Sequence, residues 1–178
     1  MDLRVINGDV LEAKADALII TIDGAKRGME GNIARVFARR WPEAWEEIEE
    51  EITYPLPLGE VFPFEPSSDC PFHILLMAST LNHRDILSEA AKKGIVRSAL
   101  YNAITEAASY SVKSIATVIM TGGWRLPIQS AFVAMTEGYE IALQAANDIN
   151  IDIYVMHQNQ YEIIQSIALG MGYSRGSR

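Results

Sequence analysis

Short runs of consecutive apolar residues alternate with longer amphipathic stretches along most of the chain. The runs have the length and composition of buried strands, so we predict a strand at each. They lie at residues 3–7, 16–22, 72–79, 114–120 and 151–156. The amphipathic stretches predict helices and lie at residues 32–41, 88–110, 129–148 and 160–169. Because strands and helices alternate over the second half, the pattern predicts an α/β fold with parallel strands and helices on both sheet faces.

Three further segments complete the expected organisation. The stretch 43–52 (EAWEEIEEEI) has Trp45 and Ile48 on one helical stripe and its glutamates outward, which is typical of a solvent-facing helix. The three prolines in 54–64 (YPLPLGEVFPF) favour an edge or irregular extended segment. Residues from about 171 to 178 are expected to form a frayed tail. Residues 1–178 are predicted to form one domain, because this length suits a single hydrophobic core.

Composition and charge argue against several classes of function. The 178-residue chain is 49% hydrophobic and 21% charged, and its formal net charge of −8 disfavours binding of long nucleic acid through a general basic field. The apolar runs are too short to cross a bilayer and the N-terminus does not resemble a signal peptide, so we expect a cytoplasmic protein that does not bind membranes. One cysteine and three scattered histidines predict no intrachain disulfide and no metal site, and we expect no cofactor.

Two predicted strand-to-helix connections carry the unusual residues of the chain. After the run 16–22 come Asp23, Gly24, Gly28, Glu30 and Gly31. After the run 114–120 come Thr121, Gly122, Gly123, Trp124 and Arg125. Glycines allow backbone N–H groups to face an anion, and a helix N-terminus adds favourable partial positive charge. Side by side at one sheet edge, the two loops would cradle a diphosphate, although glycine turns without any phosphate ligand are also common in α/β proteins.

Taken in order, the segments INGDV, DALIITID, GMEGNIAR, PLGEV and TGGWRLP resemble the successive motifs of the macro domain, an ADP-ribose-binding family. The resemblance extends from about residue 3 to residue 167, in matching order and spacing. It implies a three-layer α/β/α fold with a mixed, mostly parallel central sheet. It also implies that ADP-ribose or a related nucleotide-sugar diphosphate binds in a groove between the two glycine-bearing loops.

The resemblance assigns roles to individual residues. Asp9 would accept a hydrogen bond from the adenine amino group beside the Val10 N–H, and His157 would lie against the adenine face. The first phosphate loop would contain Gly28, Met29, Gly31 and Ile33, and the second Thr121, Gly122, Gly123, Trp124 and Arg125. From the residues alone, Asp9 is equally well explained as the capping residue of a Gly-Asp turn, and His157 as an ordinary residue at a loop entry.

Two acidic residues are the candidate catalytic groups. Asp23 stands where the family has the asparagine that contacts the distal ribose, and Glu30 stands where hydrolytic members have an aspartate. A coupled carboxylate pair would retain one proton near neutrality, as general acid/base catalysis of ADP-ribosyl hydrolysis requires. The alternative, that both are solvated loop acids, stays open.

The departures from the family pattern leave two hypotheses for function. Lys26, Arg27 and Arg125 replace glycines of the pattern, and their side chains either pair with phosphate or fill the groove and exclude ADP-ribose. On the first hypothesis the chain binds ADP-ribose, with or without hydrolysis. On the second it is a degenerate macro fold with an occluded groove, serving as a non-enzymatic interaction or structural module. The sequence determines neither turnover nor the oligomeric state.

Overall fold

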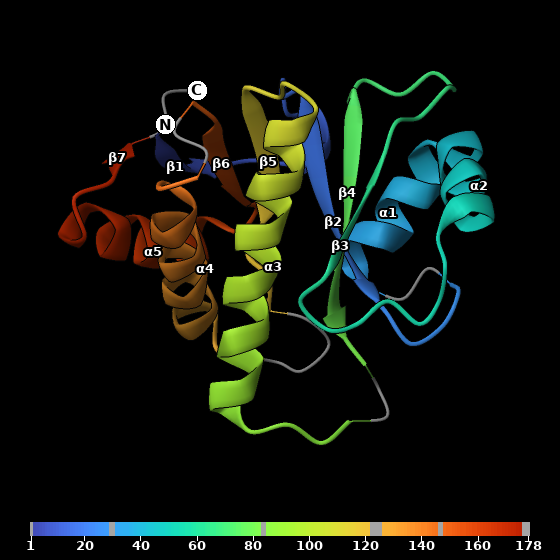
Figure 1. Ribbon diagram of the computed structural model, residues 1–178. Coiled ribbons are helices and arrows are strands. Elements are labelled where there is room, and N and C mark those ends of the chain that lie inside the picture. The colour runs from blue at the N-terminus through green and yellow to red at the C-terminus, as the bar shows by residue number, and fades with distance from the viewer. Residues whose placement is uncertain (1, 29–30, 83–84, 122–125, 146–147, 176–178) are drawn as a thin grey trace.

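The computed structural model describes residues 2–28, 31–82, 85–121, 126–145 and 148–175. Within these residues, one sheet of seven strands is accompanied by five α-helices and the short 3₁₀-helix η1 (Figure 1). In chain order the elements are β1 (Leu3–Asn7), η1 (Val10–Glu12), β2 (Ala17–Asp23), α1 (Asn32–Arg40), α2 (Pro42–Glu51), β3 (Val61–Phe64), β4 (Ile74–Leu81), α3 (Glu89–Ser109), β5 (Ser114–Val118), α4 (Ile128–Ala142), β6 (Asn150–Val155), α5 (Gln158–Gly170) and β7 (Ser174–Arg175).

The sheet is mixed and mostly parallel. Its strands follow the order β3-β4-β2-β5-β6-β1-β7, and only the β3–β4 pair is antiparallel. The central strands are buried on both faces, which is why they read as continuous apolar runs in the sequence; every residue of β4 is buried. The predicted α/β class and sheet type are therefore confirmed.

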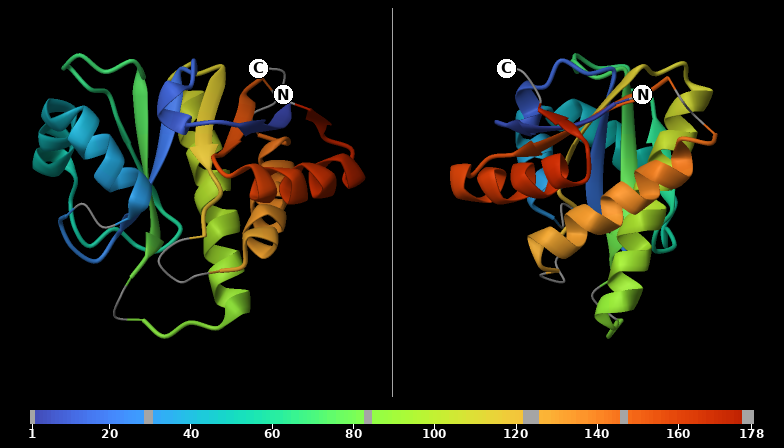
Figure 2. Two further views of the ribbon diagram at one scale, coloured as in Figure 1. Left: turned by 180° about the vertical axis from the view of Figure 1, so that it is seen from behind. Right: turned by 90° about the vertical axis from the view of Figure 1, so that its left-hand side faces the viewer.

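Helices cover both faces of the sheet, which gives three layers (Figure 2). On one face, α3, α4 and α5 contribute to a hydrophobic layer that includes Ile19 of β2. On the other, α1 and α2 contribute to a second layer that includes Leu18 and Ile20 of the same strand. Alternate β2 side chains thus enter opposite layers, as the strand period requires. No helix in the described residues has both the length and the apolar character needed to cross a bilayer.

Two segments with weak sequence signals also join the sheet. The proline-bearing segment contributes β3, a four-residue edge strand, in agreement with the prediction. The frayed-tail prediction is wrong for residues 173–175, because β7 pairs in parallel with the outer edge of β1. Tyr173 anchors this segment: its hydroxyl donates to Glu140 at 2.8 Å, and its ring packs edge-on against Tyr139.

Helices α3 and α4 approach closely at Gly138. A Cβ atom at this position of α4 would collide with the backbone carbonyl oxygen of Arg97 in α3. Glycine therefore sets the distance between the two helices that cover the centre of the sheet.

We expect Gly138→Ala to lower the free energy of unfolding by about 2 kcal/mol, because a helix carbonyl cannot move aside for the new methyl group. The matched control is Gly94→Ala in α3, where the new Cβ meets only the end of the Arg97 side chain at 3.9 Å. This control should raise stability by up to about 1 kcal/mol through helix propensity. Urea denaturation followed by circular dichroism measures both, and equal stabilities would contradict the close helix contact.

Candidate functional site

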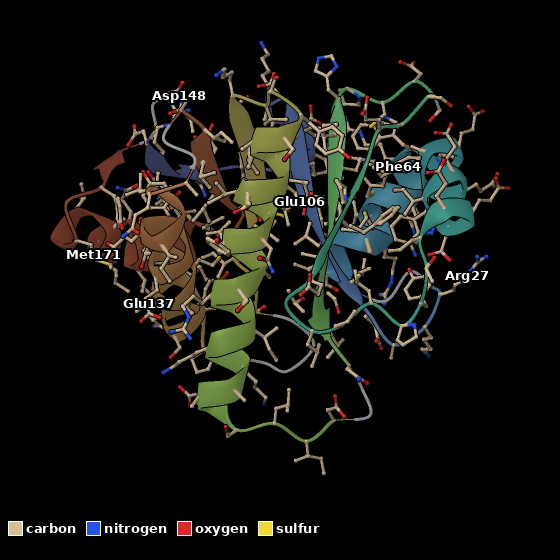
Figure 3. The ribbon with its side chains drawn as sticks, in the orientation of Figure 1. Arg27, Phe64, Glu106, Glu137, Asp148 and Met171 are labelled. Atoms are coloured by element: carbon tan, nitrogen blue, oxygen red, sulfur yellow. The ribbon has the colours of Figure 1, made fainter. Side chains whose placement is uncertain are left out.

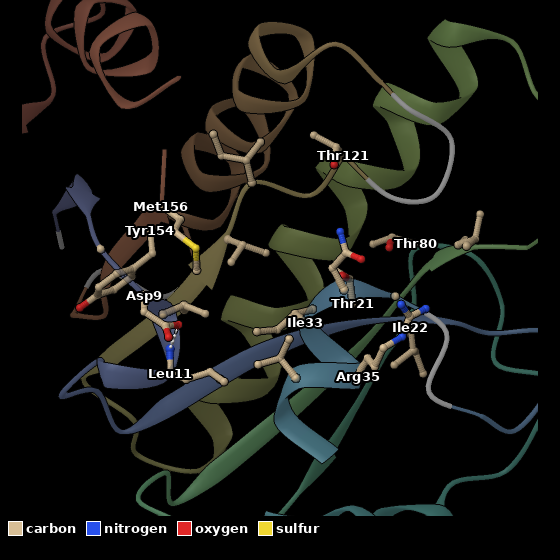
Figure 4. A pocket seen from close by; sticks show the side chains of 18 residues that line it. Asp9, Leu11, Thr21, Ile22, Ile33, Arg35, Thr80, Thr121, Tyr154 and Met156 are labelled. Atoms are coloured by element: carbon tan, nitrogen blue, oxygen red, sulfur yellow. Dashed lines mark hydrogen bonds between the residues drawn. The ribbon is translucent and has the colours of Figure 1, made fainter. Parts of the chain in front are cut away.

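A cavity of about 500 Å³ opens at the carboxyl ends of the parallel strands (Figure 4). Its walls come from the ends of β2, β4, β5 and β6, from the residues that follow β1, and from the first turns of α1. In open α/β sheets this edge is where ligands bind, because loops and helix N-termini shape a crevice there. Folding therefore brings together segments that are as distant in sequence as Gly8 and Met156.

One end of the cavity is built on the turn after β1. The Oδ1 atom of Asp9 accepts a hydrogen bond from the Leu11 N–H at 3.0 Å and so caps η1. The Gly8 N–H donates to the Val155 carbonyl oxygen at 3.2 Å, which holds the turn against β6. Asp9 thus caps the turn and also lines the cavity.

An aromatic ring stands beside this turn. Tyr154 of β6 lines the cavity, and a Cβ at Gly8 would lie 3.7 Å from its ring. Burial and the nearby Asp152 carboxylate raise the pKa of the Tyr154 hydroxyl, against an opposing effect of Arg4. Arg4 and Asp152 are themselves joined across β1 and β6 by two hydrogen bonds of 2.8 and 2.9 Å. This end of the cavity therefore combines a carboxylate with the ring of a neutral phenol.

The N-terminus of α1 forms the middle of the cavity. Gly31 is the N-cap residue and provides no side-chain cap, and Asn32 and Ile33 also line the wall. The first N–H groups of a helix have no acceptor within the helix, so they are available to a ligand. Gly31 has a φ of 123°, and a Cβ there would lie only 2.9 Å from the Thr21 carbonyl oxygen. The glycine therefore lets α1 start directly against the end of β2.

Hydroxyl groups and one cation form the other end. Thr21 of β2 and Thr80 of β4 line the cavity near Arg35 of α1, across Ile33 from Asp9 (Figure 4). Thr121, which follows β5, lines it as well. Sequence reasoning missed Thr21, Thr80 and Arg35. A signal was available for Thr21 and Thr80, because each is a polar residue near the carboxyl end of an otherwise apolar strand. The carboxyl ends of such strands form the ligand-binding edge of the sheet.

Five of the residues singled out from the sequence line the cavity: Asp9, Val10, Gly31, Ile33 and Thr121. Gly28 and His157 do not; His157 is exposed immediately before α5, and Tyr154 and Met156 line the cavity on that side instead. Six others lie outside the described residues: Met29, Glu30, Gly122, Gly123, Trp124 and Arg125.

Asp23 is buried and does not line the cavity. Only 2% of its surface is exposed, and its Oδ1 atom accepts a hydrogen bond from the Ala25 N–H at 2.8 Å. The pairing of β2 with β4 shifts register between Ile22 and Asp23. The extra residue at this shift is Thr80, so the irregularity lies in β4 and not in β2. The burial of Asp23 contradicts the alternative that it is a solvated loop acid.

Lys26 and Arg27 are exposed, and neither lines the cavity. Arg27 lies on the α2 side of the molecule (Figure 3). Its charge opposes the rise in the Tyr54 pKa that burial and Glu49 cause. These two side chains thus leave the cavity open, whereas Arg125 is outside the described residues. No cluster of three metal-ligating side chains occurs in the described part of the chain.

Comparison with protein-family models found no match, and neither did a search of the curated proteins. Solved structures do match. The macrodomain of Thermus aquaticus DarG is 22% identical, with a TM-score of 0.67 over 86% of this chain and 97% of that one. An Oceanobacillus iheyensis macrodomain with MES bound is 16% identical, with a TM-score of 0.77 over 95% and 91%. A Trypanosoma brucei macrodomain in complex with ADP-ribose is 14% identical, with a TM-score of 0.72 over 93% and 68%.

The fold implied by the sequence motifs is therefore confirmed. The chain has the macrodomain fold, with its cavity at the carboxyl edge of the sheet.

We expect Gly31→Ala to destabilise the protein by about 2 kcal/mol, because the new methyl group meets a strand carbonyl and the φ angle disfavours a side chain. Gly8→Ala is the matched control, since it also lines the cavity but its Cβ would make ordinary contacts of 3.7 and 3.9 Å with Tyr154. Chemical denaturation compares the two variants. A Gly31→Ala protein as stable as the control would contradict the close approach of α1 to β2.

Proposed function

We propose that the chain binds ADP-ribose, or a related nucleotide-sugar diphosphate, in the cavity at the carboxyl edge of its sheet. The observation that carries the proposal is the pairing, in one cavity, of the uncapped N-terminus of α1 with the Asp9 carboxylate at one end. The first suits a diphosphate and the second suits a base with an exocyclic amino group. Macrodomains of the same fold are known in complex with ADP and with ADP-ribose, which supports the choice of ligand.

The adenine would occupy the end formed by Asp9, Val10 and Tyr154. Capping of η1 engages one Asp9 oxygen, and a carboxylate has further lone pairs to accept a bond from the adenine amino group. The Tyr154 ring offers an apolar, polarisable surface to a base. His157, assigned to the adenine face by resemblance, is replaced in this proposal by Tyr154.

The diphosphate would lie against the start of α1. The N–H groups of Asn32 and Ile33 would donate to it, and the partial positive charge of the helix N-terminus would favour its negative charge. Thr121 and the loop that follows it would close the cradle from the β5 side. The distal ribose would then reach the hydroxyl groups of Thr21 and Thr80, which can donate to and accept from sugar hydroxyls.

The open cavity supports binding over the alternative of an occluded groove. Its volume of about 500 Å³ is within the range of small-molecule sites. Lys26 and Arg27, the described side chains that were candidates to fill it, do not line it. We therefore assign the chain a ligand-binding role and not a purely structural one.

At ADP-ribose concentrations about 100 times Kd, we expect stabilisation of about 2.7 kcal/mol and a rise in Tm of about 5–10 °C. Asp9→Asn should weaken binding about tenfold, because the amide keeps an oxygen for the Leu11 N–H but turns an NH₂ group toward the adenine amine. Asp148→Asn is the control, since Asp148 is exposed and lies before the first residue of β6, at the amino ends of the strands and away from the cavity. Calorimetric titration gives Kd for all three proteins, and thermal denaturation with and without ADP-ribose gives Tm. An unchanged Tm for the parent protein would refute the proposal.

We further propose that Glu30, which precedes Gly31 in the chain, supplies the acid/base group if the protein hydrolyses an ADP-ribosyl linkage. Glu30→Gln should then lower turnover about 100-fold while leaving ADP-ribose affinity unchanged. Asp23→Asn should retain most activity, because Asp23 does not line the cavity and the amide oxygen can still accept from Ala25. Release of ADP-ribose from a modified protein is the readout, and equal rates for Glu30→Gln and the parent protein would remove Glu30 from the mechanism.

A further inference from the structure

The segment that enters and forms α1 is basic, although the chain as a whole is acidic. Residues 26–40 hold five of its 15 lysines and arginines and one acid, Glu30, in a protein of net charge −8. The five cations are Lys26, Arg27, Arg35, Arg39 and Arg40. By contrast, α2 has six glutamates among its ten residues. The two helices of this layer thus carry opposite charge.

The exposed face of α1 begins at the cavity and continues away from it along the helix. Arg35 lines the cavity, and Arg39 is exposed one turn further along the helix. Residues four apart in a helix are neighbours on its surface, so Arg35 and Arg39 are on one face of α1. No ion pair between described residues involves either of them. Arg40 differs, because it pairs with Glu12 at 2.6 Å and packs over the Trp41 ring.

We infer that this face, defined by Arg35 and Arg39, docks an acidic polypeptide segment next to the residue that carries the ADP-ribose held in the cavity. The inference rests on the proposed function and specifies its substrate: an ADP-ribosylated protein with acidic residues flanking the modification. Arg35 meets the segment at the cavity mouth, and Arg39 meets it one helical turn away.

The geometry of the layer limits the length of the segment. The nine residues of α1 span about 13 Å, which corresponds to about four residues of extended chain. Beyond the helix lies α2, joined to α1 through the rings of Phe37, Trp41 and Trp45. Its glutamates repel a longer run of negative charge. The basic face therefore suits a short acidic stretch and disfavours an extended polyanion.

The same surface offers little to a nucleic-acid strand. Proteins that hold single strands combine a continuous basic groove with exposed aromatic rings on which bases stack. The exposed residues of α1 include no aromatic side chain, and Trp41 at its end is partly buried under Arg40. An acidic peptide needs only charge-assisted contacts, which two exposed arginines provide.

The test uses the full chain and two synthetic peptides, each carrying one ADP-ribose through a hydrolysis-resistant linkage. Four glutamates flank the modified residue on each side in the first peptide, and four glutamines in the second. We expect about tenfold tighter binding of the glutamate peptide at low salt, from two exposed charge contacts of about threefold each. The difference should largely vanish at 1 M salt, where the Debye length is about 3 Å.

Variants separate the docking face from the cavity. Arg39→Gln should weaken binding of the glutamate peptide about threefold and leave free ADP-ribose and the glutamine peptide unaffected, because Arg39 does not line the cavity. Arg97→Gln in α3, on the other face of the sheet, should change nothing. Equal affinity for the two peptides would overturn the inference, and so would tighter binding of an ADP-ribosylated oligonucleotide. Failure of free ADP-ribose to bind would instead overturn the proposed function, and this inference with it.

Discussion

The burial of β2 on both faces is the constraint on which the site depends. Its apolar side chains enter both hydrophobic layers, so the strand can expose polar groups only near its carboxyl end. Thr21 lies there. Gly31 packs so close to it that a Cβ at position 31 would lie 2.9 Å from the Thr21 carbonyl oxygen. This part of the cavity wall therefore consists of the end of β2 and the start of α1, which can approach closely because Gly31 between them in space has no side chain.

The sequence predicted this architecture because its physical causes are local. Strands buried on both faces read as apolar runs, and helices on both faces follow from the alternation of elements. The position of the cavity then follows from topology, since parallel strands end at one edge. Gly31 was found because a glycine before a helix is a visible signal, and Asp9 was found because its segment resembles a macro-domain motif.

The remaining features depend on pairing between distant segments. The burial of Asp23 and the register shift between β2 and β4 both arise from the packing of distant segments, and the isolated motif contains neither. Thr80 lies one residue beyond the strand expected at 72–79, so its place at the ligand-binding edge was not apparent. The two-residue strand β7 has no periodicity of its own, and its order comes from the Tyr173 contacts and the open edge of β1.

Positive and negative charges are segregated on different helices in this protein, so the net charge of the whole chain does not describe each surface. At physiological ionic strength, exposed charges act over about 8 Å, so a ligand at the α1 surface experiences Arg35 and Arg39 more than the net charge of −8. A basic face can therefore operate on an acidic protein. The overall acidity still disfavours long-range attraction of polyanions.

The short outer strands have a consequence for self-association. One edge of the sheet is β3, four residues long with Pro63, which has no N–H to donate, and the other is the two-residue β7. Within the described residues, neither edge presents a long row of unpaired backbone groups to another molecule. Growth of the sheet by addition of strands from a second chain is thereby discouraged.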